Sequence, residues 1–182
     1  MKNIILGVTG SIAAYKAADI SNILTKNRYN VDVIMTKSAR EFITPLTFQS
    51  LTKNKVYIDM FEEITPSEIK HISLAKKADL CLIAPASANI IGKLANGIAD
   101  DMLSTVVMAM NKVPVFICPA MNTNMYINPI VQRNIKTLSD LGYNFVEPKE
   151  SVLACGDLGK GALADVDVII KTIENHFINT NA

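Results

Sequence analysis

The chain has 182 residues, a length typical of one domain with a sizeable core. Hydrophobic residues make up 49% of it, yet no apolar run reaches the ~20 residues that a membrane-spanning helix needs. The first residues lack a signal peptide's apolar segment and cleavage site, and a net charge of +1 gives no footprint for nucleic acid. We therefore expect one cytoplasmic domain, residues 1–182, that binds neither membranes nor nucleic acid.

Three cysteines and two histidines leave little room for metal or disulfide chemistry. Cys81, Cys118 and Cys155 form no C-x-x-C pair, and their odd number argues against a closed disulfide framework. Two histidines are too few for a zinc site with these cysteines, so we expect no metal. Cys81 and Cys118 lie inside apolar segments and are expected to pack in the core.

Apolar segments alternate with amphipathic segments along the chain. Strands are predicted at residues 4–8, 31–35, 80–84, 115–118 and 143–146, and helices at about 12–26, 67–77, 90–98, 102–110, 129–141 and 166–177. This alternation is typical of a parallel sheet covered by helices on both faces. The predicted fold class is α/β, a single Rossmann-like three-layer sandwich with a central parallel sheet.

The turn between the first strand and the first helix, residues 7–12, has features of a phosphate site. Gly10 permits close backbone approach, Ser11 can cap the helix, and the positive end of the helix attracts anions. The full G-x-G-x-x-G spacing is missing. Residues 35–38 carry hydroxyls and a lysine where an NAD-binding protein has an acidic residue. Taken alone, the turn is explained equally well by a junction without a ligand.

Two predicted strands run into Pro-Ala, at residues 85–86 and 119–120. Proline cannot donate to a sheet ladder, so each strand is expected to stop there. Ligands of open α/β sheets bind beyond the carboxyl ends of the strands. Asn89 and Asn122 follow these ends and are candidates for contacts with a ligand, although asparagine is also common as a turn or cap residue.

Four short motifs occur in order: residues 7–12, Pro85-Ala86-Ser87-Ala88-Asn89 followed by Lys93, residues 119–125, and Ala154-Cys155-Gly156-Asp157. Together they resemble the homo-oligomeric flavin-containing cysteine decarboxylases, from residue 2 to about residue 170. The resemblance implies a flavodoxin-like fold that binds FMN, and a trimer or trimer-based assembly with active sites between subunits.

The resemblance also implies roles for individual residues. The expected FMN-binding residues are Gly10, Ser11, Ile12, Thr36, Ser38, Ser87, Ala88, Asn89 and Ala120. His71 matches the active-site histidine, Asn122 a substrate-binding asparagine, and Cys155 a catalytic cysteine on a flexible flap at about residues 148–163. Met125 is assigned to the substrate by its motif, although a methionine here is also typical of packing.

Two departures from the family pattern limit what can be carried over. Tyr126 stands where many members have tryptophan, and Ala162 stands where many have arginine, so no arginine contact is expected. The synthetase half that many bacterial relatives carry is not present either, so we expect a stand-alone decarboxylase.

His71 and Cys155 also stand out by their own chemistry. At helical spacing His71 shares a face with Leu74, Ala75 and Ala78, with Ser67 and Glu68 at the expected helix start. Such a histidine is often a hydrogen-bonded core residue, but here we favour a general base or an orienting group.

Cys155 lies in the glycine-rich segment 151–161, expected to be too flexible for the core. A flap of this kind could close over a substrate and deliver a proton. The alternative for Cys155 is an incidental exposed thiol. His176, in a polar C-terminal segment, is given no role.

The implied activity is that of a carboxy-lyase in coenzyme A biosynthesis, acting on the small molecule phosphopantothenoylcysteine. Oxidation of its thiol to a thioaldehyde by FMN gives the carboxylate an electron sink; CO₂ leaves, and reduction of the ene-thiol yields 4'-phosphopantetheine. Alternatives are a peptidyl-cysteine decarboxylase of lantibiotic maturation and a non-catalytic flavin-binding regulatory protein, which would need none of His71, Asn122 and Cys155. A flavin prenyltransferase or an NAD-dependent reductase fits the motifs less well.

Overall fold

The computed structural model of the chain describes residues 1–61, 68–152 and 158–180. Ser67 and the four residues of the motif Ala154-Cys155-Gly156-Asp157, all named above, lie outside the described residues. Within the described part, no helix is both long enough and apolar enough to cross a bilayer.

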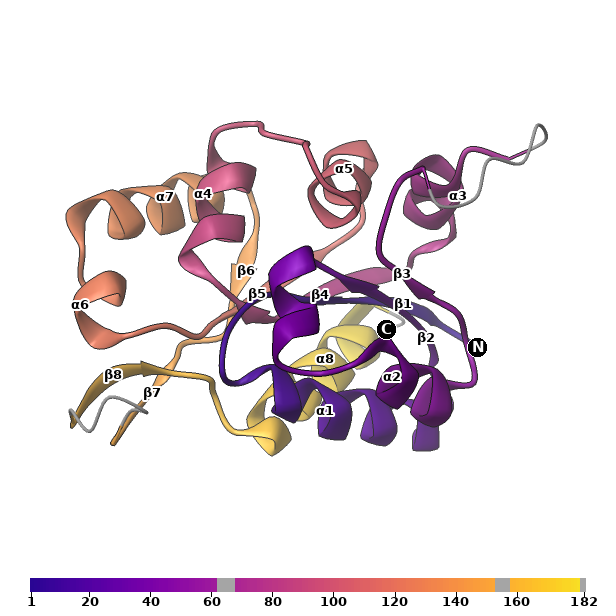
Figure 1. The fold of residues 1–182 in the computed structure, drawn as a ribbon, viewed down its shortest axis with the longest axis horizontal. Coiled ribbons are helices and arrows are strands. Elements are labelled where there is room, and N and C mark those ends of the chain that lie inside the picture. The colour runs from indigo at the N-terminus through magenta and orange to yellow at the C-terminus, as the bar shows by residue number, and fades with distance from the viewer. Residues whose placement is uncertain (62–67, 153–157, 181–182) are drawn as a thin grey trace.

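A six-stranded parallel sheet forms the centre of the molecule (Figure 1). Its order is β3-β2-β1-β4-β5-β6. The strands are β1 (Asn3–Val8), β2 (Asn30–Met35), β3 (Val56–Tyr57), β4 (Leu80–Ala86), β5 (Val115–Pro119) and β6 (Asn144–Phe145). The chain moves outward from β1 to β3, then returns to place β4 on the other side of β1. The carboxyl ends of β1 and β4 therefore flank the point where the strand order reverses, which is where open α/β sheets bind ligands.

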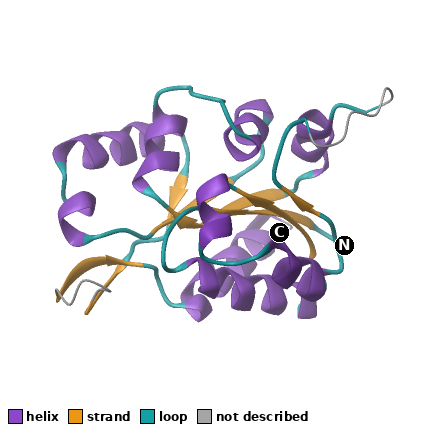
Figure 2. Ribbon diagram, in the orientation of Figure 1, coloured by secondary structure: helices purple, strands orange, loops and turns teal. Residues whose placement is uncertain are grey.

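Helices cover both faces of the sheet, as Figure 2 shows. One face packs against α1 (Ala14–Lys26), α2 (Pro45–Thr52) and α8 (Val166–Thr180), and the other against α3 (Lys70–Lys77), α4 (Ala88–Ala95), α5 (Met102–Ala109) and α7 (Pro129–Asp140). Each face has its own cluster of buried apolar side chains. The predicted three-layer α/β sandwich is confirmed.

The central strands are apolar throughout because neither face meets water. Every residue of β4 is buried, and so are residues 4–8 of β1. Burying one valine, leucine or isoleucine side chain stabilises the fold by roughly 1.5–3 kcal/mol. The middle of the sheet is therefore a firm base for the loops at its carboxyl edge.

The prediction that the fourth strand stops at Pro85 was wrong, since β4 continues to Ala86. Pairing between β4 and β5 shifts register between Ile83 and Ala86. At such an irregularity the missing N–H of proline costs no ladder bond. β5 does end at its proline, Pro119.

Several short elements were not predicted. They are the 3₁₀ helix η1 (Lys37–Glu41), α2, β3 and α6 (Thr123–Tyr126). The described part of α3 begins at Lys70, so Glu68 precedes this helix rather than lying in its first turn. α8 extends past the predicted end to Thr180 and contains His176, whose ring packs edge-on against Phe116 at 5.2 Å between centroids.

The glycine-rich segment near the C-terminus was predicted as a loop, but its described parts form an antiparallel hairpin. The strands are β7 (Lys149–Val152) and β8 (Leu158–Ala162), separate from the central sheet (Figure 1). Gly161 lies against the turn before α6, where an added Cβ would be 2.3 Å from the carbonyl oxygen of Met121, and Gly159 lies against the side chain of Thr123 in α6. Glycine here serves close backbone contact rather than flexibility.

Candidate active site

The first two loops at the carboxyl edge of the sheet touch each other. A Cβ built on Gly10 would lie 2.4 Å from Cβ of Ser38 and 3.2 Å from its carbonyl carbon. Only a glycine lets the turn after β1 approach the start of η1 so closely. The expected FMN-binding residues Gly10 and Ser38 are therefore neighbours, although 28 positions separate them in the sequence.

Three helices begin at this edge, and hydroxyl side chains cap the starts of two of them, η1 and α4. The prediction that Ser11 caps the first helix was wrong, because the N-cap of α1 is Ala13 and no side chain caps it. Ser11 Oγ instead accepts a hydrogen bond from the N–H of Ala13 at 3.3 Å, in the turn before the helix. Thr36 caps η1 and Ser87 caps α4, accepting from N–H groups three residues further on. First-turn N–H groups have no partner within their own helix, and they carry the positive end of the helix dipole. The edge therefore presents donors to an anion.

The remaining residues assigned to the first and third loops lie around these caps. Ile12 is 60% exposed, Ala88 is half-buried and Asn89 is exposed in the first turn of α4. Asn89 is therefore not the cap of its helix, since Ser87 holds that place. Its amide faces outward and can meet a ligand.

Thr9 was not identified from the sequence, yet it connects two of the loops. It follows β1 directly and is buried, and its hydroxyl contacts the carbonyl of Pro85 and the N–H of Ser87. The only sequence signal was a hydroxyl residue between buried Val8 and Gly10, and hydroxyl residues are common in such turns.

The segment after β5 supplies the expected substrate-binding residue. Ala120 is buried and its N–H donates to the carbonyl of Ala86 at 3.0 Å, which joins the ends of β5 and β4. Asn122 caps α6, its Oδ1 accepting from the N–H of Asn124 at 2.8 Å. The N–H of Met121 donates to the carbonyl of Gly161 at 2.9 Å, so the hairpin is attached next to Asn122.

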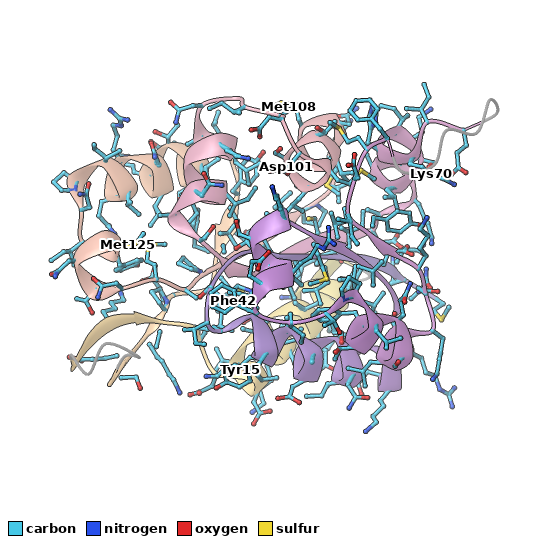
Figure 3. The ribbon with its side chains drawn as sticks, in the orientation of Figure 1. Tyr15, Phe42, Lys70, Asp101, Met108 and Met125 are labelled. Atoms are coloured by element: carbon cyan, nitrogen blue, oxygen red, sulfur yellow. The ribbon has the colours of Figure 1, made fainter. Side chains whose placement is uncertain are left out.

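The ring of Tyr126 lies between α6 and the hairpin. Its hydroxyl donates to a carboxylate oxygen of Glu147 at 3.1 Å, and Nζ of Lys160 lies 5.6 Å from the ring centroid. Lys160 also pairs with Glu147 at 2.6 Å and, through this hydrogen bond, holds the pKa of that carboxylate below its ordinary range. Met125, on α6 at the left end of Figure 3, is 48% exposed and is not a core residue.

His71 is half-buried in the first turn of α3. Leu74, Ala75 and Ala78, on the same face, are buried against the sheet, as predicted. Because α3 leads directly into β4, its first residues lie toward the carboxyl edge of the sheet. Across the described residues, no hydrogen bond links His71 to the first three loops or to Asn122.

Lys93 is engaged with carboxylates within the protein. Its Nζ lies 2.6 Å from Asp100 and 2.7 Å from Asp101, and Asp101 also caps α5. Burial raises the pKa of Asp101, but hydrogen bonds from Lys93 and Ser104 outweigh it and lower the pKa below its ordinary value. These pairs tie α4 to the start of α5 and leave Lys93 poorly placed to bind a phosphate.

Two of the three cysteines are core residues, as predicted. Cys81 and Cys118 are fully buried in β4 and β5. Burial raises the pKa of the Cys81 thiol to about 12 and that of Cys118 even further. Neither thiol can ionise near neutral pH.

Comparison with known proteins agrees with this arrangement. Residues 1–178 match the Flavoprotein family, and the chain belongs to that family. It is 57% identical to a probable phosphopantothenoylcysteine decarboxylase of Streptococcus mutans, over 95% of this chain and 97% of that protein. It is 53% identical to the coenzyme A biosynthesis bifunctional protein CoaBC of Bacillus subtilis, covering 97% of this chain but 43% of that longer protein.

Solved structures give the same relationship. A mutant of PPC decarboxylase complexed with pantothenoylaminoethenethiol superposes with a TM-score of 0.88 at 32% identity, over 97% of this chain and 98% of that one. The FMN-dependent cysteine decarboxylase SpaF superposes with a TM-score of 0.83 at 32% identity, over 94% of each chain. The resemblance to flavin-containing cysteine decarboxylases is confirmed.

Proposed function

We propose that this chain is an FMN-dependent carboxy-lyase that converts phosphopantothenoylcysteine to 4'-phosphopantetheine in coenzyme A biosynthesis. The similarity to the Streptococcus mutans protein extends over nearly the whole of both chains. The observation that carries the proposal is the convergence of Gly10, Ser38 and Ser87 at the point where the strand order reverses.

The described loops fit a flavin mononucleotide. The contact of Gly10 with Ser38 leaves no room for a side chain. The starts of α1, η1 and α4 present N–H and hydroxyl donors, and the residues assigned to these loops include no acidic group. Gly10, Ser11, Ile12, Thr36, Ser38, Ser87, Ala88, Asn89 and Ala120 would hold the cofactor. Donors at helix starts suit a phosphate group.

When bound, FMN would supply a two-electron acceptor for the substrate thiol and a reductant for the decarboxylated product. The imidazole of His71 takes up the proton of the substrate thiol or orients that thiol. The Asn122 amide donates to the substrate carboxylate and Met125 packs beside the substrate. The thiol of Cys155, on the flap at about residues 148–163, returns a proton to the product.

We also propose a single cytoplasmic domain that assembles as a trimer or a multiple of trimers, with His71 facing the flavin of an adjacent subunit. Large apolar side chains in and beside the first two loops support an assembly. Ile12 is 60% exposed, and Tyr15 and Phe42, both labelled in Figure 3, are 57% and 49% exposed. Exposed apolar groups gathered at a site are typical of protein interfaces. Mass measurement in solution tests the assembly.

The decisive experiment is turnover of phosphopantothenoylcysteine by the purified yellow protein, with release of CO₂ as the readout. A peptide ending in cysteine serves as the competing substrate. Faster turnover of the peptide would assign the chain to peptide maturation instead. Full FMN occupancy with no turnover of either compound would support a regulatory flavin-binding protein.

Two variants test the assigned chemistry. His71→Asn should remain folded and yellow but release no CO₂, and retained turnover would remove His71 from the mechanism. Cys155→Ser should still release CO₂ but fail to complete the reduction, leaving a bleached flavin absorbance. Normal product from that variant would show that the thiol takes no part.

A further inference from the structure

The first and third loops are joined by one buried hydroxyl group. Thr9 is 1% exposed. Its Oγ1 donates to the carbonyl oxygen of Pro85 at 2.7 Å and accepts from the N–H of Ser87 at 2.9 Å. The hydroxyl thus uses its single donor and one of its two acceptor positions within the protein.

This connection begins where the sheet ladder ends. β1 and β4 pair from Ile4 with Leu80 to Gly7 with Ile83. Beyond that pair, the N–H of Thr9 reaches the carbonyl of Pro85 at a long 3.3 Å. The two shorter bonds of the side chain therefore set the spacing of the strand ends at the point where the order reverses.

The two linked loops carry donors assigned to FMN. Ser11, two residues after Thr9, precedes α1, and Ser87, which donates to Thr9, caps α4. Fixing the N–H of Ser87 on Thr9 fixes the first residue of the third loop against the first. Oγ1 of Thr9 already makes hydrogen bonds to Pro85 and Ser87. It can therefore contribute to cofactor binding by positioning the two loops rather than by touching the cofactor.

We propose that Thr9 is a positioning residue for the flavin: its hydroxyl holds the first and third loops at the separation that FMN binding requires. This inference rests on the proposed FMN dependence of the chain. Removing the hydroxyl leaves the N–H of Ser87 without its partner, and the start of α4 must shift to satisfy it, since a buried unpaired donor is costly.

The test compares Thr9→Val and Thr9→Ser, purified as yellow proteins. Serial dilution releases FMN, and the rise of free-flavin fluorescence gives the dissociation constant. Thr9→Val keeps the shape and loses the hydroxyl, so FMN should bind at least about tenfold more weakly. Thr9→Ser keeps the hydroxyl and should stay within about twofold of the wild type.

Thr52→Val is the matched control. Thr52 is also buried, and its hydroxyl donates to the carbonyl of Phe48 and accepts from the N–H of Asn54 in the same manner. It lies at the end of α2, outside the loops assigned to the cofactor. Thr52→Val should lower the Tm while leaving the FMN dissociation constant unchanged.

Three results would overturn the inference: wild-type affinity in Thr9→Val, equally weak binding in Thr9→Ser, or an equal loss of affinity in Thr52→Val. If Thr9→Val does not fold, Thr9→Ala compared with Thr52→Ala decides in the same way. A wild-type protein that binds no FMN would overturn the proposed function as well, whereas tight wild-type binding with an unaffected Thr9→Val would overturn this inference alone.

Discussion

Gly10→Ala should damage the candidate site through one steric contact. The added Cβ would lie 2.4 Å from Cβ of Ser38, 3.2 Å from its carbonyl carbon and 3.4 Å from its Cα. Non-bonded carbon atoms rest at about 3.5–4.0 Å, so the loops must separate by about 1 Å. Rotation of the serine side chain cannot relieve this contact, because Cβ and the backbone are the atoms involved.

The size of the effect follows from that displacement. Overpacking a close contact costs about 1–3 kcal/mol, and each kcal/mol lowers the Tm of a chain of this size by about 2–4 °C. If the loops move apart in the folded state instead, the loss appears in cofactor binding, where 1.4 kcal/mol is about tenfold in affinity. Thermal unfolding measures the loss of stability, and FMN fluorescence on dilution measures the loss of cofactor affinity.

Two controls isolate the contact. Gly92 lies inside α4, and in Gly92→Ala the nearest atom to the new Cβ is Nδ2 of Asn134 at 3.7 Å. Because alanine favours the helix more than glycine does, this variant should be more stable by about 0.5–1 kcal/mol. In the double variant Gly10→Ala/Ser38→Gly the shortest contact disappears, and part of the loss in Tm should return. FMN affinity is not the readout for this variant, because Ser38 is itself assigned to the cofactor. If Gly10→Ala keeps both the wild-type Tm and FMN affinity, the close approach of the two loops is not what makes glycine necessary.

Three further outcomes are expected. Asp101→Asn keeps the helix cap but loses the charge. Because the folded pKa of Asp101 is depressed, the stabilisation by its charge exists above the ordinary carboxyl pKa and vanishes as the pH falls. Urea unfolding should therefore distinguish the variant from the wild type at pH 7 but not at low pH. Lys77→Met leaves the buried carboxylate of Asp32 without its 2.6 Å partner and should cost about 1–3 kcal/mol; an unchanged Tm would contradict this. In native protein at pH 8, Cys81 and Cys118 should resist alkylation until unfolding, as peptide mass mapping can check.

The main architecture could be predicted because its signals are local. Continuous apolar runs mark strands buried on both faces, and β1, β2, β4 and β5 were recovered from them with ends shifted by at most two residues. α2 gave no comparable signal, since only Phe48 and Thr52 of its residues are buried and the others are half-buried or exposed. β3 consists of two residues and exists through its pairing with β2.

The residues of the candidate site likewise fall into those that the local sequence indicates and those that only the fold brings together. Gly10 and Ser11 lie in one turn that local sequence can indicate, whereas the approach of Ser38 to Gly10 exists only after β1 and β2 have paired. Pro85 was taken as a strand end because local chemistry gives no sign of a register shift with the neighbouring strand. Thr9 was missed for the same reason, since its partners lie 76 and 78 positions away.

The hairpin is attached to the α6 region by main-chain contacts as well as by the contacts of Lys160 with Glu147 and Tyr126. The carbonyl of Gly161 bonds the N–H of Met121, and Gly159 allows its backbone to lie against Thr123. The hydrogen bond between Met121 and Gly161 does not depend on the charge or size of the other hairpin side chains. Other side chains of the hairpin can therefore change without breaking this main-chain bond. A hairpin transplanted from a relative would need glycines at these two places and a cation at the position of Lys160 to make the same contacts.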